Sequence, residues 1–499
     1  MVERSHPEEP RVVAERAEQP GSLWRNRDYM AWWTGNGMST LGTAVSTIAF
    51  PLLVLHTTGS LAQAGSITAA QMIGTLVTLA VGGALADRVS RRLVMTVAPL
   101  VQGVALGLVA LLVHRGAPSI LALDALALIS GFAAGLRTSV SMPALRRIVP
   151  KEQVSTATAQ GMGRDMIAHL VGAPLGGLLF SLARWAPFLF DALSFLFVTV
   201  GALLIRRPLG PDRDTDAGRP PGMLADITDG LRMIRRSDYL MFTIIWGALL
   251  NVVTEGFTLL FIALVHHRGG GPAAVGTATS LALVGGVIGA VAGPWMIRRL
   301  GARRVLTLSA WVVTATFAIT VWTPQPWQIG VVTMIGMISM VPLNVVTESY
   351  QVRLVPDAYL GRVAATNRFC VQAVQWSGPL GAGFAADAIG VPGAVLILTA
   401  VMAVLALALW TYRRRLDILD VPLSEVRELD PPAPGPRESA TSAASTENAA
   451  NATSATRTTS TTSTTSTTST GNTASAGSAT SAESSPERHD DREPSGRLS

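Results

Sequence analysis

The chain has 499 residues, of which 49% are hydrophobic and 14% are charged, and its formal net charge is +6. Soluble globular domains carry about 25% charged residues, so this composition argues against a soluble protein. The positive charge does not indicate a nucleic-acid partner, because the arginines gather at the ends of apolar segments, where they set membrane topology.

Sequence signs of an enzymatic site are missing. The chain has no Gly-Lys-Ser/Thr phosphate-binding loop and no His and Cys cluster with metal-site spacing. The single cysteine, Cys370, excludes a disulfide within the chain and a thiolate-bound metal cluster. We therefore expect no enzymatic activity, no cofactor and no metal.

Long uncharged segments follow a polar stretch, residues 1–24, which we expect to be a flexible cytoplasmic arm. Residues 29–55 and 57–86 contain no Asp, Glu, Lys, Arg or His. A helix needs about 20 apolar residues to cross a bilayer, and a first segment this long is not a cleaved signal peptide. The sequence thus predicts an all-α membrane protein with twelve transmembrane helices, at 29–55, 62–86, 93–114, 119–141, 155–181, 185–205, 239–264, 274–297, 304–322, 327–348, 364–387 and 391–412.

A repeat relates the two halves of this pattern. The segment from Gly83 to Asp87 resembles the segment from Gly289 to Gly293, 206 positions later. Ile148-Val-Pro150 recurs at the same offset as Leu354-Val-Pro356. Parallel duplication of a six-helix unit is the plan of a transporter that rocks around a central site. The predicted domains are two six-helix pseudo-repeats, 25–207 and 238–415, and a cytoplasmic linker, 208–237.

The basic residues of the loops predict the orientation. The loops that follow the even-numbered spans hold between two and seven Lys or Arg each, whereas the other loops hold only Arg115, Arg184 and Arg268. The positive-inside rule then places both termini in the cytoplasm of a multi-pass protein of the plasma membrane. Residues 416–499 are rich in Ser, Thr and Ala and cannot bury a core, so we expect a disordered tail.

The first motif lies in the turn between the second and third predicted spans. Its residues are Gly83, Asp87, Arg88, Arg91 and Arg92. We expect Gly83 to allow close helix packing, and Asp87 to face a helix N-terminus or an arginine across the gap between the domains. This turn resembles the loop motif of the major facilitator superfamily. Ser90 replaces the usual glycine, and the second copy has Gly293 in place of the acid.

The second motif lies in the fifth predicted span and its repeat. Small residues allow helices to approach closely, and proline bends a helix because it lacks a backbone N–H. The motif resembles one associated with exporters of the superfamily, although close packing without directional meaning is the alternative. Its residues are Gly172, Pro174, Gly176, Gly177, Gly378 and Pro379.

Three further segments resemble one branch of the superfamily. They are Trp24 to Asp28, Ser141 to Pro150 and Phe190 to Phe195. They are similar to the branch that contains the enterobactin exporter and macrolide efflux proteins, over residues 24–412. The resemblance implies a proton-driven exporter of a drug-like or siderophore-like molecule. Many members carry an acid in the first span where this chain has Thr43, so another group is expected to bind the proton.

Ionisable residues inside predicted spans are functional candidates, because they are costly in a bilayer. Asp165 and His169 are four positions apart and share a helix face, and Glu255 is the only acid of its span. We expect Asp165, His169 and Glu255 to be proton-coupling candidates. The alternatives are an Arg164–Asp165 pair with a packed histidine, and a hydrogen bond from Glu255 to a neighbouring helix. Asp191 and Asp124 are expected to be structural.

Polar and basic residues on one face of a span indicate cavity lining, with hydrogen bonds between helices as the alternative. The first span carries such a stripe at steps of three and four. Arginines within spans are candidates for anionic groups of the substrate, unless they reach the interface. The cavity candidates are Asn36, Thr40, Thr43, Gln71, Arg137, Arg164, Asn251 and Arg368.

The sequence thus predicts a monomer that works with a small-molecule substrate, protons and the lipid bilayer. An importer or uniporter of the same fold is one alternative. A membrane scaffold or sensor that acts through residues 416–499 is another, and it predicts that transport is not the function.

Overall fold

The computed structural model describes residues 22–88, 90–116, 118–205, 223–412, 417–421 and 423–429. Most of the predicted arm 1–24, half of the linker 208–237 and most of the tail 416–499 lie outside these residues. Within them the chain is helical and no strand occurs. The predicted all-α fold is therefore confirmed for the described part.

The first half of the chain forms six long helices. Asn26 begins the first, because its side chain accepts hydrogen bonds from the Asp28 and Tyr29 amides. Gly59, at φ 72°, ends it in a left-handed conformation that suits glycine. The helices are α1 (Arg27–Thr58), α2 (Leu61–Arg88), α3 (Arg91–His114), α4 (Ile120–Ile148), α5 (Val154–Leu182) and α6 (Ala186–Leu204), with short 3₁₀ turns at Leu23–Arg25 and Lys151–Gln153.

The second half begins with a short amphipathic helix in the predicted linker. An ion pair between Arg362 and Asp229, 3.7 Å long, ties this helix to a later one. The helices are α7 (Met223–Ile234), α8 (Asp238–His267), α9 (Pro272–Leu300), α10 (Ala302–Trp322), α11 (Pro326–Leu354), α12 (Asp357–Gln375), α13 (Ser377–Ile389) and α14 (Val391–Tyr412), with 3₁₀ turns at Asp417–Asp420 and Leu423–Glu425.

Ten helices of the described part are long and apolar enough to cross a membrane. They do not include α2, α12 or α13, so twelve spans remain a prediction. The predicted span 364–387 is broken at Trp376 into α12 and α13. Pro379 contributes to the break, because it has no N–H to donate to the carbonyl of Gln375 and its ring crowds that carbonyl. Polar side chains also make α12 less apolar than its neighbours.

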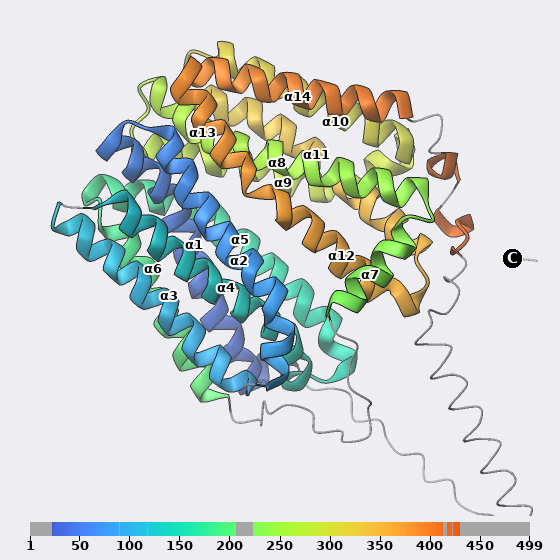
Figure 1. Ribbon diagram of the computed structural model, residues 1–499, viewed down its shortest axis with the longest axis horizontal. Coiled ribbons are helices and arrows are strands. Elements are labelled where there is room, and N and C mark those ends of the chain that lie inside the picture. The colour runs from blue at the N-terminus through green and yellow to red at the C-terminus, as the bar shows by residue number, and fades with distance from the viewer. Residues whose placement is uncertain are drawn as a thin grey trace, which may run out of the picture. The chain divides into compact units, whose positions relative to one another are not determined.

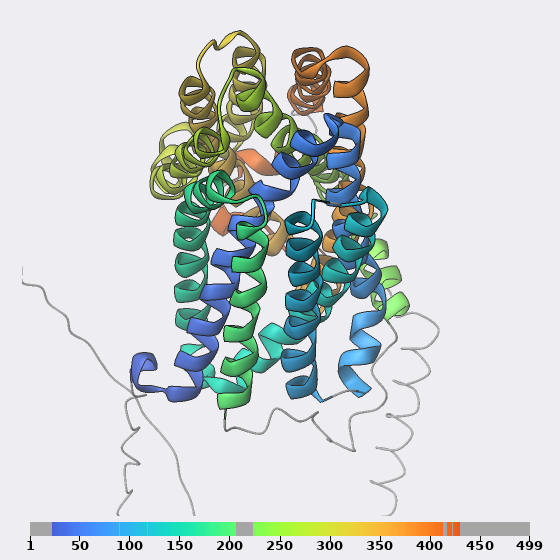
Figure 2. The ribbon, with the colours of Figure 1, turned by 90° about the vertical axis from the view of Figure 1, so that its left-hand side faces the viewer.

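The long helices pack as two sets, α1–α6 and α8–α14 (Figure 1). Within the first set α1 packs on α5 and α6, and α2 packs on α4. In the second set α9 packs on α11, and α10 packs on α11 and α14. Figure 2 shows the first set from its side, with its helices running roughly alongside one another.

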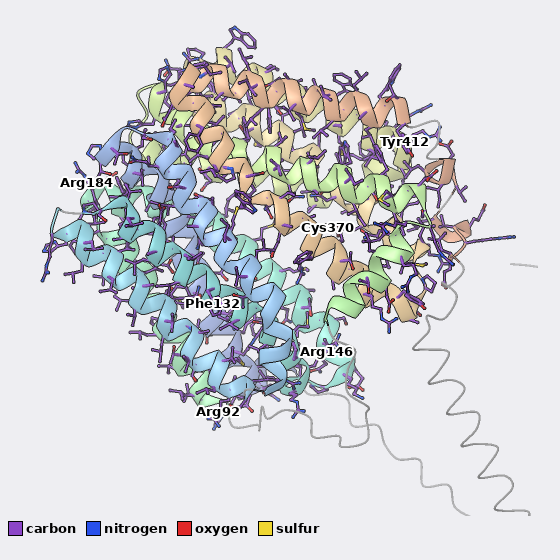
Figure 3. The ribbon with its side chains drawn as sticks, viewed as in Figure 1. Arg92, Phe132, Arg146, Arg184, Cys370 and Tyr412 are labelled. Carbon is purple, nitrogen blue, oxygen red and sulfur yellow. The ribbon has the colours of Figure 1, made fainter. Side chains whose placement is uncertain are left out.

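The two ends of the helices differ in charge. We call the ends that carry Arg92 and Arg146 the basic ends, and the ends near Arg184 the distal ends (Figure 3). The axes of the two sets converge at the distal ends and diverge toward the basic ends (Figure 1). Under the predicted orientation the basic ends face the cytoplasm.

The two most extensive contacts between the sets, α5 with α9 and α2 with α13, include the distal ends. A Cβ atom on Gly177 would meet the Pro272 carbonyl and come within 3.1 Å of the Ala273 Cα. A Cβ atom on Gly383 would meet the Leu61 carbonyl in the same way. These glycines therefore let the helix backbones touch.

Candidate functional site

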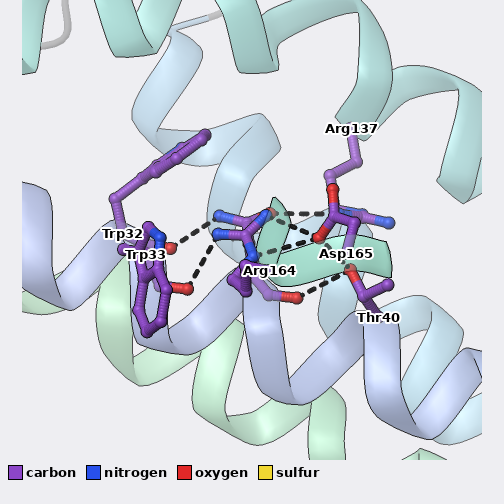
Figure 4. A network of polar contacts seen from close by, with 7 residues as sticks. Trp32, Trp33, Thr40, Arg137, Arg164 and Asp165 are labelled. Carbon is purple, nitrogen blue, oxygen red and sulfur yellow. Dashed lines mark hydrogen bonds and ion pairs between the residues drawn. The ribbon is translucent and has the colours of Figure 1, made fainter. Parts of the chain in front are cut away.

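The first polar cluster joins α1, α4 and α5 (Figure 4). Arg164 donates to Asp165 Oδ1 from Nε at 3.0 Å and from Nη2 at 2.8 Å, and to the Trp33 carbonyl from Nη1 at 2.8 Å. Thr40 donates to the same carboxylate oxygen at 3.0 Å. The Arg164 guanidinium also lies over the rings of Trp32 and Trp33. Asp165 is thus held as the partner of a cation.

The pair predicted on one face of α5 is not joined. His169 is exposed, and the described structure gives it no hydrogen bond to Asp165. Helical spacing placed both residues on one face, but Asp165 turns to the adjacent Arg164. The structural alternative for Arg164 and Asp165 describes the observed contacts, and a coupling role for His169 stays a prediction.

Arg137 on α4 reaches α1. Its Nη1 donates to Asn36 Oδ1 at 3.2 Å, and Asn36 Nδ2 donates to the Trp32 carbonyl. Its Nε is buried and has no hydrogen-bond partner among the described residues. The acidic groups that act on this guanidinium are Asp191, more strongly, and Asp165. Two of the predicted cavity residues, Asn36 and Arg137, therefore contact each other.

A cavity of about 240 Å³ lies between the two helix sets, and we call it the central cavity. It combines one carboxyl group, Glu255, with hydroxyl, amide and apolar side chains. Gln71, a predicted cavity residue, lines it. The complete lining is Thr47, Pro51, Thr68, Gln71, Met72, Thr75, Glu255, Thr258, Leu259, Ile262 and Pro379.

Glu255 joins this cavity to a second one. Gln375 donates to Glu255 Oε1 at 2.9 Å, from the last residue of α12. Gln375 also lines a cavity of about 420 Å³ between α11 and α12, toward the basic ends, which we call the basic-end cavity. Arg368 and Glu348 line it as well. The Glu255–Gln375 hydrogen bond therefore stands between the two cavities.

Sequence reasoning missed Gln375 as a partner of Glu255. The repeat indicated Gln375 as a candidate. It lies 206 positions after His169, a predicted proton-coupling residue, at the equivalent place in the second half. The break at Trp376, next to Pro379, then directs the end of α12 toward α8.

Several polar residues of the spans bond to helix carbonyls. Thr75 and Thr78, which follow Gln71 on α2, donate to the Gly131 and Phe132 carbonyls of α4, as in the alternative of hydrogen bonds between helices. Asn251 donates to the Gly247 carbonyl of its own helix. Thr43 is half-buried, and its carbonyl accepts hydrogen bonds from two residues of α1. Their roles in substrate binding stay predictions.

The predicted gating turn is only partly described. The side chains of Gly83, Asp87 and Arg88 lie outside the described residues, so the proposed contacts of Asp87 are not tested. Arg92 Nη2 donates to the Leu203 carbonyl at 2.9 Å, and the Ser90 side chain caps α3. The basic part of the turn thus holds α3 against the end of α6.

The glycine and proline motif packs helices closely. A Cβ on Gly172 or Gly176 would press on α1, at Ala44 and Val45 respectively, and a Cβ on Gly378 would press on Val252 of α8. Gly276 lies against Pro174, and Gly65 lies against Pro379. The motif therefore positions α5 and α13 against neighbours in both sets, and its link to export stays a prediction.

Asp387 of α13 caps α2 from the other helix set. Its carboxylate accepts hydrogen bonds from the Ser60 hydroxyl at 2.6 Å and from the Leu61 and Ala62 amides at 2.8 and 3.1 Å. An anion at a helix N-terminus is favourable, because the amides there are otherwise unpaired. The contact joins residues 325 to 327 positions apart, so no local pattern in the sequence announced it.

Comparisons with known proteins agree with this architecture. A sequence profile of the Major Facilitator Superfamily matches residues 32–372 and 244–464. The nucleoside transporter NupG has the same fold, with a TM-score of 0.64 at 14% identity over 77% of this chain and 98% of that chain. A bacterial homologue of the iron transporter ferroportin gives 0.60 at 18% identity, over 77% and 100%. At such identities the likeness concerns the fold alone.

Curated relatives are efflux proteins. The multidrug efflux pump Tap of Mycolicibacterium fortuitum is 24% identical over 406 residues, 78% of this chain and 94% of the pump. Tap of Mycobacterium tuberculosis (strain ATCC 25618 / H37Rv) is 27% identical over 207 residues, so the match spans about half of that relative, 48%. The enterobactin exporter EntS of Escherichia coli O1:K1 / APEC is 26% identical over 331 residues, 65% of this chain and 77% of the exporter.

Proposed function

Because the chain belongs to the Major Facilitator Superfamily, we propose that it is a secondary active exporter that exchanges protons for a small molecule by alternating access. The proposed cargo is drug-like or siderophore-like, since the similar proteins Tap and EntS are named for multidrug efflux and enterobactin export. The protein acts as a monomer in the plasma membrane, with both termini in the cytoplasm.

One observation carries the proposal. The central cavity lies between the two helix sets, and its single carboxyl group, Glu255, is bonded to a residue of the basic-end cavity. A half-buried acid inside a span is a functional candidate, because partial burial makes its charge costly. A cargo molecule and a proton that enter from the basic ends both reach Glu255. Binding of one at Glu255 therefore excludes binding of the other.

The arrangement of the helix sets supports alternating access. The sets touch through α5–α9 and α2–α13 at the distal ends, while their axes diverge toward the basic ends (Figure 1). With the basic ends in the cytoplasm, this is an inward-facing conformation. Rocking of the sets would separate the distal contacts and expose Glu255 to the outside.

The cavity chemistry narrows the cargo. Met72, Leu259 and Ile262 offer apolar surface, and Gln71 and Thr68 offer hydrogen bonds. Such a mixture suits an amphipathic molecule. The Arg164–Asp165 pair belongs to the first helix set, and we propose that it supports the wall formed by α1 and α5. We propose that this pair contributes less to proton binding than Glu255 does.

Inverted membrane vesicles test the proposal. A panel of dyes, antibiotics and siderophores is offered with and without an inside-acid pH gradient. Gradient-dependent uptake of at least one compound into the vesicles is expected, and Glu255→Gln should weaken the gradient dependence. Uptake by the wild-type protein that ignores the pH gradient would contradict proton exchange and favour a uniporter.

A further inference from the structure

Asp191 on α6 is a buried carboxyl group that has no role in the proton exchange proposed at Glu255. It is 1% exposed, and it is the only acidic side chain of the described part that is fully buried. Its Oδ2 lies 2.5 Å from Ser46 Oγ on α1, and its Oδ1 lies 3.2 Å from Ser194 Oγ. No cation of the described residues forms an ion pair with it.

The side of Asp191 that faces α1 is closely packed. A Cβ atom on Gly42 would come within 2.6 Å of Asp191 Oδ1. On the other side of α6, Gly103 of α3 lies against the carbonyl of Ala192. Among the described residues, two hydroxyl groups form the side-chain hydrogen bonds of this carboxyl group, which is unusual for a buried charge.

The two serines suit both protonation states. Ser46 Oγ can donate to Asp191 Oδ2 or to the Thr43 carbonyl at 3.2 Å. Ser194 Oγ can donate to Asp191 Oδ1 or to the Asp191 carbonyl at 2.7 Å. Each hydroxyl can point to the carboxylate when Asp191 is ionised, and to the backbone when the carboxyl group itself donates. The site therefore keeps its hydrogen bonds whether or not it holds a proton.

Arg137 of α4 is the charged group whose field acts on Asp191. It is held by one hydrogen bond, to Asn36, and its Nε has no partner in the described part of the chain. Asp165 acts on the same guanidinium less strongly, and Arg164 repels it. Asp165 already has Arg164 as a partner. Arg137 is thus available to Asp191 when a negative charge appears there.

From this geometry we infer that Asp191 is a second proton-binding residue of the exchanger, separate from Glu255. The inference rests on the proposed proton exchange. Loss of the proton breaks the O–H bond of Asp191, the proton passes to water of the transport pathway, and the carboxylate that remains pairs with Arg137. Rebinding of a proton releases Arg137 to Asn36. Arg137 therefore pairs with Asp191 when Asp191 is ionised and bonds to Asn36 when Asp191 is protonated.

The first test is steady-state transport in proteoliposomes, using a cargo identified with the vesicle panel. Each coupled proton multiplies the attainable concentration ratio by about ten for each unit of pH difference. Asp191→Asn should lower this ratio by about tenfold at one unit. Asp124→Asn is the matched control, because Asp124 also bonds a serine, Ser66, but is half-buried. An unchanged ratio in Asp191→Asn would overturn the inference.

The second test needs neither cargo nor a folded Asp191 variant. Infrared spectroscopy of the purified protein, with Asp124, Asp165 and Glu255 replaced by amides, should show a protonated-carboxyl band that disappears reversibly at raised pH. Arg137→Gln should move this loss to higher pH. A band that persists wherever the protein stays folded would show a permanently protonated structural residue. A wild-type protein without gradient-driven transport but with a titrating band would reject the proposed exchange and leave Asp191 a titrating site.

Discussion

The two contacts that close the distal ends are built alike but are not equal. At each, a glycine of α5 or α13 lies against the first turn of a helix from the other set, Gly177 at α9 and Gly383 at α2. Only α2–α13 adds an anion, Asp387, which caps α2. The residue 206 positions earlier, Ser181, donates to its own helix instead. Both contacts therefore have the close packing, but only α2–α13 has a carboxylate that caps a helix of the other set. We call this Asp387 cap the latch.

This difference indicates how the distal ends open. The α5–α9 contact adds to its packing one hydrogen bond, from Ser280 Oγ to the Leu170 carbonyl at 2.8 Å. The Asp387 cap, by contrast, is three hydrogen bonds that are lost together. We expect α2–α13 to control the opening and α5–α9 to act as the hinge side. The following changes test this division, beginning with the largest expected effect.

Gly383→Ala should disrupt the α2–α13 contact most. Its new methyl group would overlap the Leu61 carbonyl and approach the Ala62 Cα to 2.9 Å, and both are backbone atoms. Overpacking of this kind costs about 1–3 kcal/mol, so the closed distal contact should be lost and transport should fall about tenfold or more. The matched control is Gly381→Ala on the same helix, where nothing lies within 4 Å. Equal transport by the two variants would refute the packing argument.

Asp387→Asn should shift the conformational equilibrium with less damage. It keeps the size of the side chain but removes the charge that faces the α2 amides. A loss of about 1–2 kcal/mol corresponds to about a 5–30-fold shift toward the open distal ends. Labelling of a distal-end cysteine by a membrane-impermeant reagent measures the shift. Ser181→Ala is the control, and labelling that rises equally in both variants would contradict the latch.

Asp165→Asn should have the smallest effect. The Asp165 side chain is 42% exposed, so solvent screens its ion pair with Arg164, and Arg164 keeps its bond to the Trp33 carbonyl. We expect a loss of about 1 kcal/mol in stability and nearly unchanged gradient dependence. Thermal unfolding and vesicle transport check both. Loss of proton coupling in this variant would move the coupling site from Glu255 and Asp191 to α5.

The sequence was sufficient for the helical architecture, because long apolar runs between basic turns have few other solutions in a bilayer. It was insufficient where the partner of a side chain comes from a distant helix. The spacing of Asp165 and His169 indicated a pair, yet Arg164 took the carboxylate. Asp191 was expected to be structural, and only the fold places Ser46 and Arg137 near it. Asp387 carried no local signal, because its partners lie at the start of α2.

The span from 364 to 387 shows a second limit. Its length and apolar second half predicted one continuous helix, but Pro379 and the polar face of α12 break it at Trp376. The sequence contained a signal for this break, because a proline cannot donate a hydrogen bond to the carbonyl four residues earlier. Its consequence, the Gln375–Glu255 bond, required the position of α8.

The most direct test of alternating access is a distance between the sets at the distal ends. Spin labels at Leu182 on α5 and Ile389 on α13, both exposed, report this distance after Cys370→Ala removes the native thiol. We predict a single short distance at rest, a second longer distance that grows with cargo and pH, and a dominant longer distance in Asp387→Asn. One distance that no cargo, pH or latch substitution changes would contradict the account.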